Sequence, residues 1–456
     1  MKCELMDEIV VKYNWSAPYY TSYPPLREWT FNFKSENFEN ALMDLMNKNE
    51  PISFYFHFPF CRQKCLYCFC NSKITSDRRE IKSFLRDIGT EIERFYEFFK
   101  KHSFKPVVKD IQIGGGSPSY MTDEEFKFLV DKIKLLVDPL ELEEFAFEVD
   151  PRSIDSERIE FFKSFGVNRI SLGVQDFDPY VQKAVNRIQP KELVETFFTP
   201  KVKSGLKGIN IDLLYGLPLQ SIDSFRKTVK TSISLSPERI TLLKYAHTPE
   251  REICQRALEK YSFPDYIEKT RIFKEALDSF EEAGYVHVGI NDFVKSDDEL
   301  AIALKDKTLH RIFNGFSPGR AKNLIAIGPS STSAFNGYYF QNVYLEDYNE
   351  QLSKTKFPIL KGYKLSKDDL IRREVINLLL CERLINIKKI EEKYNIEFKE
   401  YFQDEIEKLK SFIADDLIEF SEEFIKITSL GKMFIPHISS KFDNFLINKE
   451  YKVSGP

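Results

Sequence analysis

From about residue 50 to residue 290 the chain repeats one pattern, in which a short β-rich run ends in polar residues or glycine and an amphipathic helix follows. Strands are expected at 52–58, 110–113, 145–151, 169–174, 208–214 and 239–245, with a weaker one at 286–290. Strand–helix alternation over this length predicts a parallel sheet, closed or nearly closed as a barrel. Because a complete barrel has eight strands and six are well supported, the expected fold class is α/β, with an open, partial (β/α)6 TIM-like barrel.

Polar side chains lie at or beyond the carboxyl ends of these strands, which is where the catalytic residues of parallel barrels lie. Glu148 shares the face of Ala146, so it can point into the barrel. Asp212 is flanked by apolar residues, and a carboxylate there is costly unless it is paired or bound to a ligand. The alternative for each such residue is an internal salt bridge or a satisfied polar group of the core. The other polar residues at strand ends are Tyr55, His57, Gln175, Arg187 and His247.

Cys61, Cys65 and Cys68 follow the first expected strand with the spacing Cys-x3-Cys-x2-Cys, and Cys70 comes two residues later. Three thiolates can hold three irons of a [4Fe–4S] cube and leave the fourth iron open to a ligand. Zinc is the alternative, but it usually takes two close pairs of ligands, and no second pair follows downstream. Cys70 is too close to Cys68 to reach the open iron without distorting the loop, so we expect it beside the cluster or on the substrate side.

A glycine run, Gly114-Gly115-Gly116-Ser117-Pro118, follows the second expected strand. Glycines let the backbone approach a ligand closely, although turns also use them. No Gly-Lys-Ser/Thr follows, so this is not a Walker loop. Next to a loop that binds a cluster, the run is placed to receive the ligand of the open iron.

The flanks of the chain lie outside the repeated pattern. Residues 1–45 lack periodicity, and from about residue 365 the chain is helical and charged and closes with an expected hairpin at 417–427. Helices followed by a small hairpin suggest a winged-helix-like domain, without a basic face for nucleic acid. The expected domains are an N-terminal arm (1–45), a barrel (46–360) and a helical C-terminal domain (361–456).

The amino-acid composition restricts the binding partners and the cellular compartment that we expect for this chain. Lys+Arg is 66 and Asp+Glu is 70, a balance that does not call for nucleic acid or an anionic membrane. No run approaches the roughly 18–20 apolar residues of a membrane helix, and the first residues lack the apolar region of a signal peptide. Four of the seven cysteines fall within ten residues, which favours reduced thiols in the cytoplasm. Cys3, Cys254 and Cys381 are interpreted as small buried hydrophobic residues.

The spacing Cys-x3-Cys-x2-Cys is the signature of the radical S-adenosylmethionine (SAM) superfamily. Within it, the chain resembles the oxygen-independent coproporphyrinogen III oxidases. Matching stretches run over nearly the whole chain and include residues 12–16, 20–24, 57–70, 114–116, 148–152, 173–177, 185–187, 210–218, 245–247, 297–301, 310–313 and 371–373. The fourth cysteine and the Tyr-Thr-Ser-Tyr-Pro arm are what distinguish this family from the superfamily.

The resemblance implies a partial (β/α)6 barrel with a helical C-terminal domain and two SAM molecules in one site. Cys61, Cys65 and Cys68 would bind the [4Fe–4S] cluster. The first SAM would contact Tyr55, Gly115 and Glu148, and Thr332 stands where the family has an apolar residue beside SAM. The second would contact Tyr67, Gly116, Ser117, Gln175, Arg187, Asp212 and Ala246. Cys70 and Glu148 are the expected catalytic residues, and the arm is expected to contribute to the substrate site.

The implied reaction is radical chemistry on a tetrapyrrole. An electron breaks a C–S bond of SAM, and the 5′-deoxyadenosyl radical takes hydrogen from a propionate of coproporphyrinogen III. Loss of CO2 and one further electron leaves a vinyl group, as haem biosynthesis requires. The cofactors carry the hard chemistry and the protein supplies position and a dry cavity. A flavodoxin- or ferredoxin-type electron donor and a monomeric protein are expected.

Four departures from the family fall on the substrate side. Tyr19 replaces an arginine, residues 290–294 read Ile-Asn-Asp-Phe-Val in place of Met-Asp-His-Phe-Ala, Asn314 replaces glutamine and Thr332 replaces an apolar residue. Tyrosine cannot pair a carboxylate bidentately as arginine does. Two alternatives therefore stay open: a radical SAM methyltransferase, such as an anaerobic haem-opening enzyme, and a haem-binding chaperone. Chaperone relatives usually lack the fourth cysteine and the long arm, so Cys70 and residues 12–24 are evidence against that class.

Overall fold

The computed structural model describes residues 8–15 and 17–446, which fall into two compact units. The barrel unit contains residues 29–263 and 320–364. The second unit contains residues 1–28, 264–319 and 365–456 as far as they are described. The division thus lies close to the boundary expected near 360, but it places 264–319 with the termini and divides the expected arm after residue 28. Among the described residues, no helix is both long and apolar enough to cross a membrane.

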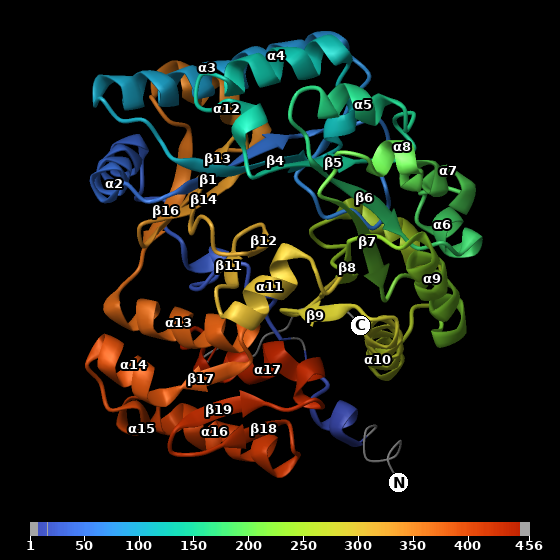
Figure 1. The fold of residues 1–456 in the computed structure, drawn as a ribbon, viewed down its shortest axis with the longest axis vertical. Coiled ribbons are helices and arrows are strands. Elements are labelled where there is room, and N and C mark those ends of the chain that lie inside the picture. Colours follow the sequence, from blue (N-terminus) through green and yellow to red (C-terminus); the bar gives the residue numbers. More distant parts are fainter. Residues whose placement is uncertain (1–7, 16, 447–456) are drawn as a thin grey trace. The chain divides into compact units, whose positions relative to one another are not determined.

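Six parallel strands form the centre of the barrel unit, in the order of the sequence (Figure 1). They confirm the six expected strands and the partial barrel. Their bounds are β1 Ile52–Phe58, β4 Val108–Gly115, β5 Glu144–Val149, β6 Arg169–Gln175, β7 Gly208–Tyr215 and β8 Arg239–Lys244. The helices between them are α3 Arg78–Lys101, α4 Asp123–Ile133, α5 Arg158–Lys163, α6 Pro179–Ala184, α7 Lys191–Glu195, α8 Pro200–Lys203 and α9 Ile222–Leu235.

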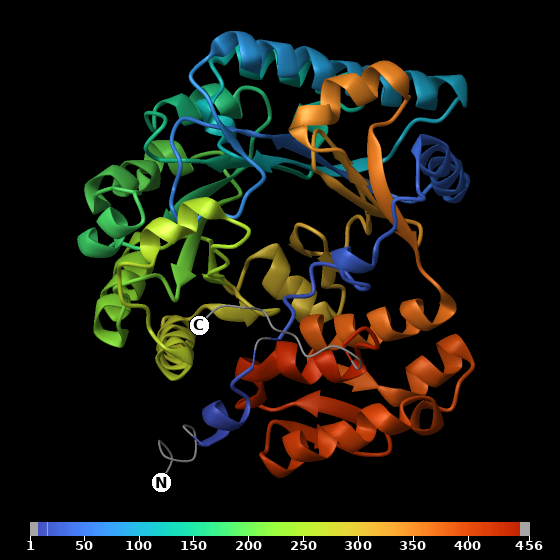
Figure 2. The same cartoon turned by 180° about the vertical axis from the view of Figure 1, so that it is seen from behind.

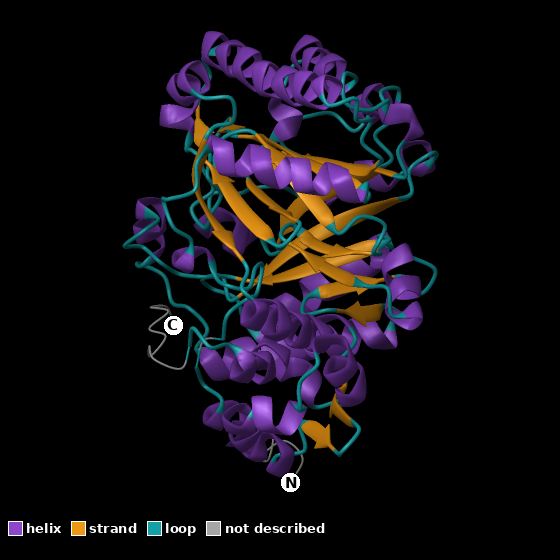
Figure 3. Cartoon of the chain, turned by 90° about the vertical axis from the view of Figure 1, so that its left-hand side faces the viewer, coloured by secondary structure: helices purple, strands orange, loops and turns teal. Residues whose placement is uncertain are grey.

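Helices lie outside the strands of this unit, as Figure 3 shows in purple and orange. Phenylalanine fills the layer between them. The ring of Phe147 on β5 packs against Phe126 of α4 and Phe162 of α5, with ring centroids 5.3 and 4.6 Å apart. Because side chains alternate along a strand, Glu148 then faces the interior of the barrel, as its parity predicted. A capping box opens α4, with Thr122 and Glu125 each accepting a hydrogen bond from the other's backbone N–H.

A seventh parallel strand, β13 Asn323–Ile327, was not predicted and pairs with the outer edge of β1. All five of its residues are buried and the four from Leu324 to Ile327 are apolar, so the strand lacks the alternation that reveals half-buried strands. The antiparallel strands β14 Thr332–Phe335, β15 Tyr338–Asn342 and β16 Ile359–Lys364 extend the sheet from it. The helix α12 Leu345–Lys354 between the last two lies along α3 (Figure 2), with the Phe84 and Tyr348 rings 6.3 Å apart.

Two further expectations are refined. The weak strand expected at 286–290 is present in shorter form as β9 Val286–Val288, and it pairs antiparallel with β10 Asp292–Val294 in the second unit. The expected arm is not free of periodicity, because α2 Ser35–Lys48 buries Phe38, Leu42 and Leu45 on one face within the barrel unit. These three apolar residues, spaced by four and three, form an apolar stripe typical of an amphipathic helix.

The C-terminal part of the second unit has the expected helices and hairpin. A three-stranded sheet, ordered β17-β19-β18, accompanies the helices and includes β17, which was not predicted. The elements are α13 Lys367–Cys381, β17 Leu384–Asn386, α14 Ile387–Tyr394, α15 Phe398–Tyr401, α16 Gln403–Ala414, β18 Ile418–Phe420, β19 Phe424–Ile427 and α17 Ile435–Ser439. The buried ion pair of Arg372 and Glu405, 2.8 Å apart, joins α13 to α16.

The rest of the second unit packs around these helices. The Tyr13 ring stacks on Phe412 at 4.6 Å, and Tyr20 donates its hydroxyl to Asp443 at 3.0 Å. The remaining elements are α10 Tyr266–Glu282, α11 Glu299–Asp306, β11 His310–Ile312 and β12 Gly315–Ser317. Cys381 is buried as expected, Cys254 in the barrel unit is only half-buried, and Cys3 lies outside the described residues.

Candidate functional site

The cysteine loop leaves β1 and is closed at its base by a short parallel ladder. β2 Phe60–Cys61 pairs with β3 Lys73–Ile74, and Thr75 donates its backbone N–H to the Cys61 carbonyl at 3.3 Å. This ladder fixes both ends of the loop, so the three cysteines of the predicted motif belong to one anchored segment.

Neighbouring loops hold the middle of the cysteine loop. Leu66 donates its N–H to the Val185 carbonyl at 3.0 Å, and Asn186 donates its side-chain amide to the Lys64 carbonyl at 2.8 Å. Both partners come from the segment after α6. The loop that follows β1 is therefore attached to the loop that follows β6.

The four thiols of the loop differ in exposure and in partners. Cys65 is buried, Cys61 and Cys68 are half-buried, and Cys70 is exposed. Burial raises the pKa of Cys61 to about 12. The hydrogen bond from the Cys70 thiol lowers the pKa of Cys68 to about 6, and the Cys70 backbone N–H also lies 3.4 Å from that sulfur. Cys70 thus lies against Cys68.

The donor set suits an iron–sulfur cluster. In the described part of the chain, no three His, Cys, Asp or Glu side chains gather closely enough to hold one metal ion. A cube distributes its thiolate ligands over separate irons, so its cysteines need not converge on one point. Cys65 Sγ accepts hydrogen bonds from two guanidinium groups, Arg152 Nη2 at 3.3 Å and Arg187 Nη1 at 3.5 Å, which suits a sulfur that carries negative charge.

The glycine loop after β4 packs directly on the start of the cysteine loop. Gly116 donates its N–H to Phe58 O at 2.7 Å, and Ser117 donates to Phe60 O at 2.9 Å. A Cβ on Gly116 would stand 2.7 Å from Phe60 O, and one on Gly115, whose φ is +115°, would stand 2.6 Å from the His57 ring. The glycines are therefore required by the contact between the two loops, a reason that the sequence did not reveal.

Glu148 and Asp212 are acidic side chains of the barrel interior. Glu148 accepts hydrogen bonds from Gln112 Nε2 and from the Gly115 N–H, both at 3.1 Å. Burial, and then the negative charge of Asp212, raise the pKa of Glu148 to about 7. Asp212 accepts from Ser171 Oγ at 3.0 Å and Asn210 Nδ2 at 2.7 Å. Two carboxyls that repel each other in this way favour a cationic ligand between them.

Tyr55 and His57, both on β1, form a short chain to the cysteine loop. The Tyr55 hydroxyl lies 3.1 Å from His57 Nδ1, and His57 Nε2 lies 3.1 Å from the Asn71 carbonyl. Burial lowers the pKa of His57 to about 4, so the imidazole is neutral at pH 7. Its Nε2 then donates to Asn71 and its Nδ1 accepts from Tyr55. His57 therefore positions the loop, and burial together with the charge of Glu148 raises the pKa of Tyr55.

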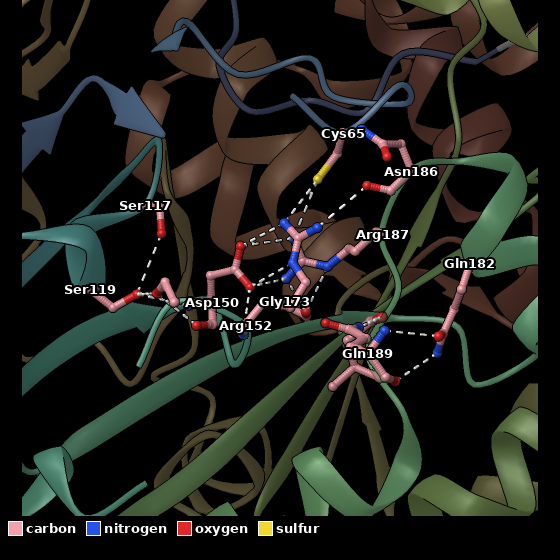
Figure 4. Close-up of polar contacts among 12 residues, drawn as sticks. Cys65, Ser117, Ser119, Asp150, Arg152, Gly173, Gln182, Asn186, Arg187 and Gln189 are labelled. Carbon is pink, nitrogen blue, oxygen red and sulfur yellow. Dashed lines mark hydrogen bonds and ion pairs between the residues drawn. The ribbon is translucent and has the colours of Figure 1, made fainter. Parts of the chain in front are cut away.

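Arg187 and Arg152 share the carboxylate of Asp150 beneath Cys65 (Figure 4). Arg152 binds it through two nitrogens, at 3.0 and 2.7 Å, while Arg187 lies 3.4 Å away. Arg187 also donates through Nε to the Gly173 carbonyl at 3.1 Å. Burial alone would raise the pKa of Asp150, but the charges of Arg187 and Arg152 lower it overall. Asp150 is therefore an anion between two cations.

The other predicted residues lie at the same ends of their strands. Gln175 ends β6 with a φ of +70°, at a register irregularity against β7. The Ala246 carbonyl, after β8, accepts from Gln255 Nε2 at 3.2 Å, and the same amide donates to the Tyr67 carbonyl at 3.2 Å. Thr332 is buried at the start of β14, after the loop in which Gly328 packs on His57.

The substrate-side departures at Tyr19, Asn291 and Asn314 belong to the second unit. There the Arg311 guanidinium lies over the Tyr19 ring, 5.6 Å from its centroid. The buried Asn291 Oδ1 accepts no hydrogen bond within the described residues.

Sequence reasoning assigned no role to Asp150, Arg152 or Gln255. Asp150 and Arg152 stand in the matched stretch 148–152, so their position signalled importance without a function. Gln255 is buried in the segment after β8 and carries no signal in the sequence, because its two partners are brought together only by the fold.

Residues 55–231 match the radical SAM superfamily, and residues 365–434 match the HemN C-terminal domain. An oxygen-independent coproporphyrinogen III oxidase from Synechocystis sp. is 35% identical over 451 residues, covering 98% of this chain and 96% of that protein. The Escherichia coli K12 protein of the same name is 33% identical over 446 residues, covering 97% and 95%. The solved structure of HemN from Escherichia coli, described as a radical SAM enzyme, aligns with a TM-score of 0.87 at 31% identity, covering 94% and 97%.

Proposed function

The chain belongs to the oxygen-independent coproporphyrinogen III oxidases, a family of radical SAM enzymes, and from this premise we propose how its residues serve the reaction. The enzyme is an oxidoreductase that converts propionates of coproporphyrinogen III to vinyl groups by oxidative decarboxylation. The observation that carries this assignment is similarity over nearly the full length, joined to a site in which the cysteine loop, the glycine loop and Glu148 meet.

Cys61, Cys65 and Cys68 are proposed to hold a [4Fe–4S] cluster with one open iron. Their anchored loop and the two guanidinium donors at Cys65 support this assignment. When bound, the cluster and SAM together supply a one-electron reductive cleavage that yields a carbon radical. The protein's part is to hold the thiolates, to place the ligand of the open iron and to exclude water.

Two SAM molecules are proposed to bind at the carboxyl ends of the strands. The first contacts Tyr55, Gly115 and Glu148, with Thr332 nearby. A buried carboxyl bonded to the Gly115 N–H and repelled by Asp212 supports this placement, because SAM carries cationic ammonium and sulfonium groups. The second contacts Tyr67, Gly116, Ser117, Gln175, Arg187, Asp212 and Ala246. Gln255 supports it by joining the Tyr67 and Ala246 backbones.

Glu148 and Cys70 are proposed as the catalytic side chains of the protein. A carboxyl whose pKa is about 7 exchanges a proton readily at neutral pH, and binding a cation beside it moves the group to the anionic form. The Cys70 thiol lies against Cys68, and that hydrogen bond, followed by burial and the charge of Glu148, raises its pKa, which supports a place for the thiol beside the proposed SAM contacts. We further propose that the enzyme is a cytoplasmic monomer and receives its electrons from a flavodoxin- or ferredoxin-type donor. We also propose that the arm contributes to the substrate site.

A methyl transfer on haem is the second function considered for such a chain. The relatives described above are named as oxidases. The departures at Tyr19, Asn291, Asn314 and Thr332 fall on the expected substrate side, and the Arg311 guanidinium lies over the Tyr19 ring, 5.6 Å from its centroid.

Anaerobic turnover of the reconstituted enzyme separates these activities. With SAM, a reductant and coproporphyrinogen III we expect CO2 and 5′-deoxyadenosine, and no reaction when haem is the substrate. Formation of S-adenosylhomocysteine with haem, without CO2 from coproporphyrinogen III, would overturn the proposed reaction. Cys65→Ala serves as the control, because it removes one proposed ligand of the cluster.

A further inference from the structure

Cys65 is the only one of the three motif cysteines whose sulfur accepts hydrogen bonds from charged side chains among residues 8–15 and 17–446. Arg152 Nη2 lies 3.3 Å and Arg187 Nη1 lies 3.5 Å from its Sγ (Figure 4). The sulfur of Cys68 accepts a backbone N–H from Cys70 instead. The environment of the motif is therefore asymmetric, with its positive charge gathered on one ligand.

The Arg152 guanidinium is held in place before any ligand binds. The Asp150 carboxylate accepts hydrogen bonds from Arg152 Nε at 3.0 Å and from Arg152 Nη2 at 2.7 Å. It also accepts a hydrogen bond from the Arg152 backbone N–H at 3.0 Å. The Asp150 backbone N–H is in turn bonded to Ser119 Oγ at 3.0 Å. Arg152 and Asp150 are both largely buried, at 12% and 16% side-chain exposure. A bidentate pair in this setting has little freedom to turn the guanidinium away from Cys65.

The charges of this group do not cancel. Arg152 and Arg187 contribute two cations and Asp150 one anion, so one positive charge is left beside Cys65. An iron–sulfur cluster held by thiolates becomes one charge more negative when it is reduced. N–H donors and positive charge near a ligand sulfur stabilise the reduced form more than the oxidised form, and burial strengthens the effect.

Arg187 and Arg152 differ in what else they do. Arg187 also bonds the Gly173 carbonyl and is a proposed contact of the second SAM. Arg152 bonds Asp150, Cys65 and, at 3.4 Å, the Asn186 carbonyl, and it has no proposed contact with SAM or substrate. A change at Arg152 therefore alters the surroundings of the cluster without removing part of the binding site.

We propose that Arg152, aligned by Asp150, is a positioning residue of the cluster, which donates a charge-assisted N–H···S bond to Cys65 and raises the cluster's reduction potential. The inference rests on the proposed cluster at Cys61, Cys65 and Cys68. It assigns the turn after β5 a role in making the first electron transfer easier. No contact between Arg152 and SAM is needed for this effect.

The test is an EPR-monitored redox titration of the reconstituted full chain, without SAM or substrate. For Arg152→Gln we expect cluster reduction to become about tenfold less favourable, which is about 59 mV lower for one electron. Arg152→Lys keeps the charge but loses the planar fork, so we expect a smaller decrease. Arg158→Gln is the control, because Arg158 bonds Asp123 and the Ser119 carbonyl but no sulfur, and its potential should equal that of the wild type.

Equal potentials for wild type and Arg152→Gln, at equal iron content, would overturn the inference. If Arg152→Gln holds no cluster, Arg152→Lys decides in its place, and an unchanged potential there overturns it as well. A wild-type chain that binds no cluster under any reconstitution would overturn the proposed function and this inference with it. Unchanged potentials in a chain that still cleaves SAM would overturn the inference alone.

Discussion

Glu148 Oε2 accepts a hydrogen bond from the Gly115 N–H at 3.1 Å, so a carboxyl of β5 and the glycine loop after β4 form one site. Replacing Glu148 by glutamine removes the negative charge offered to SAM but keeps the size of the side chain. We expect SAM affinity to fall by roughly tenfold to a hundredfold, the value of a charge-assisted hydrogen bond of about 1.5–3 kcal/mol. Calorimetric titration of the cluster-loaded protein with SAM measures this affinity.

Glu144→Gln is the matched control for that experiment. Glu144 lies on the same face of β5 at its other end, where it pairs with Arg169 at 2.8 Å. We expect this variant to lose stability, because the buried ion pair between Arg169 and Glu144 is broken, while its SAM affinity stays at the wild-type value. Equal loss of SAM affinity in both variants would contradict the role given to Glu148.

Cys65→Ala and Cys70→Ala should separate cluster binding from the role of the fourth thiol. Cys65→Ala is expected to lose the cluster's visible absorbance and all SAM cleavage. Cys70→Ala is expected to keep the cluster, because Cys70 lies against Cys68 outside the motif of three. Iron content and 5′-deoxyadenosine formation are the measurements, and complete loss of iron from Cys70→Ala would show that Cys70 is a ligand.

Gly116→Ala should separate the glycine loop from the cysteine loop. A Cβ at this position meets the Phe60 carbonyl oxygen at 2.7 Å, and backbone cannot move aside as a flexible side chain can. We expect the free energy of unfolding to fall by about 1–3 kcal/mol and the iron content of the protein to fall as well. Gly89→Ala in α3 is the control, because its nearest neighbours lie at 3.4 Å and alanine favours a helix. Thermal unfolding that is unchanged in Gly116→Ala would contradict the packing described.

Glu91 gives the barrel unit a dependence of stability on pH. It is buried in α3 and accepts hydrogen bonds from the Gly328 N–H and Asn342 Nδ2, both at 2.8 Å, and from the Tyr348 hydroxyl. Burial raises its pKa to about 7, against the opposing effects of these donors and of Arg94. Between pH of about 4.5 and 7 the folded chain holds a proton that the unfolded chain has lost. Stability from this group is therefore complete at low pH and falls as pH rises, by up to about 3 kcal/mol.

Glu91→Gln is neutral at every pH and lacks this contribution. Urea unfolding at several pH values should show the wild type losing stability relative to the variant as pH rises from about 4.5 to 7. A difference between the two proteins that does not change with pH would show that Glu91 titrates as it does in the unfolded chain.

The six central strands could be predicted because each is a short β-rich run that ends at polar residues, glycine or proline and precedes an amphipathic helix, as Ile52–Phe58 does between Pro51 and Pro59. It did not reveal β13, whose five residues are buried on both sides and show no alternation. The motif residues were found from spacing and resemblance. Arg152 and Gln255 were not, because their partners Cys65 and Tyr67 lie 87 and 188 residues away, and only the folded barrel brings them together.

The central claim is that this enzyme removes hydrogen from a propionate side chain of coproporphyrinogen III. Formation of a vinyl group by loss of CO2 requires that hydrogen to come from the carbon next to the ring. Substrate deuterated at that carbon, incubated anaerobically with the reconstituted enzyme, SAM and a reductant, tests the claim directly. We predict deuterium in 5′-deoxyadenosine together with CO2 and a vinyl product. Unlabelled 5′-deoxyadenosine with a methylated product and S-adenosylhomocysteine would contradict it.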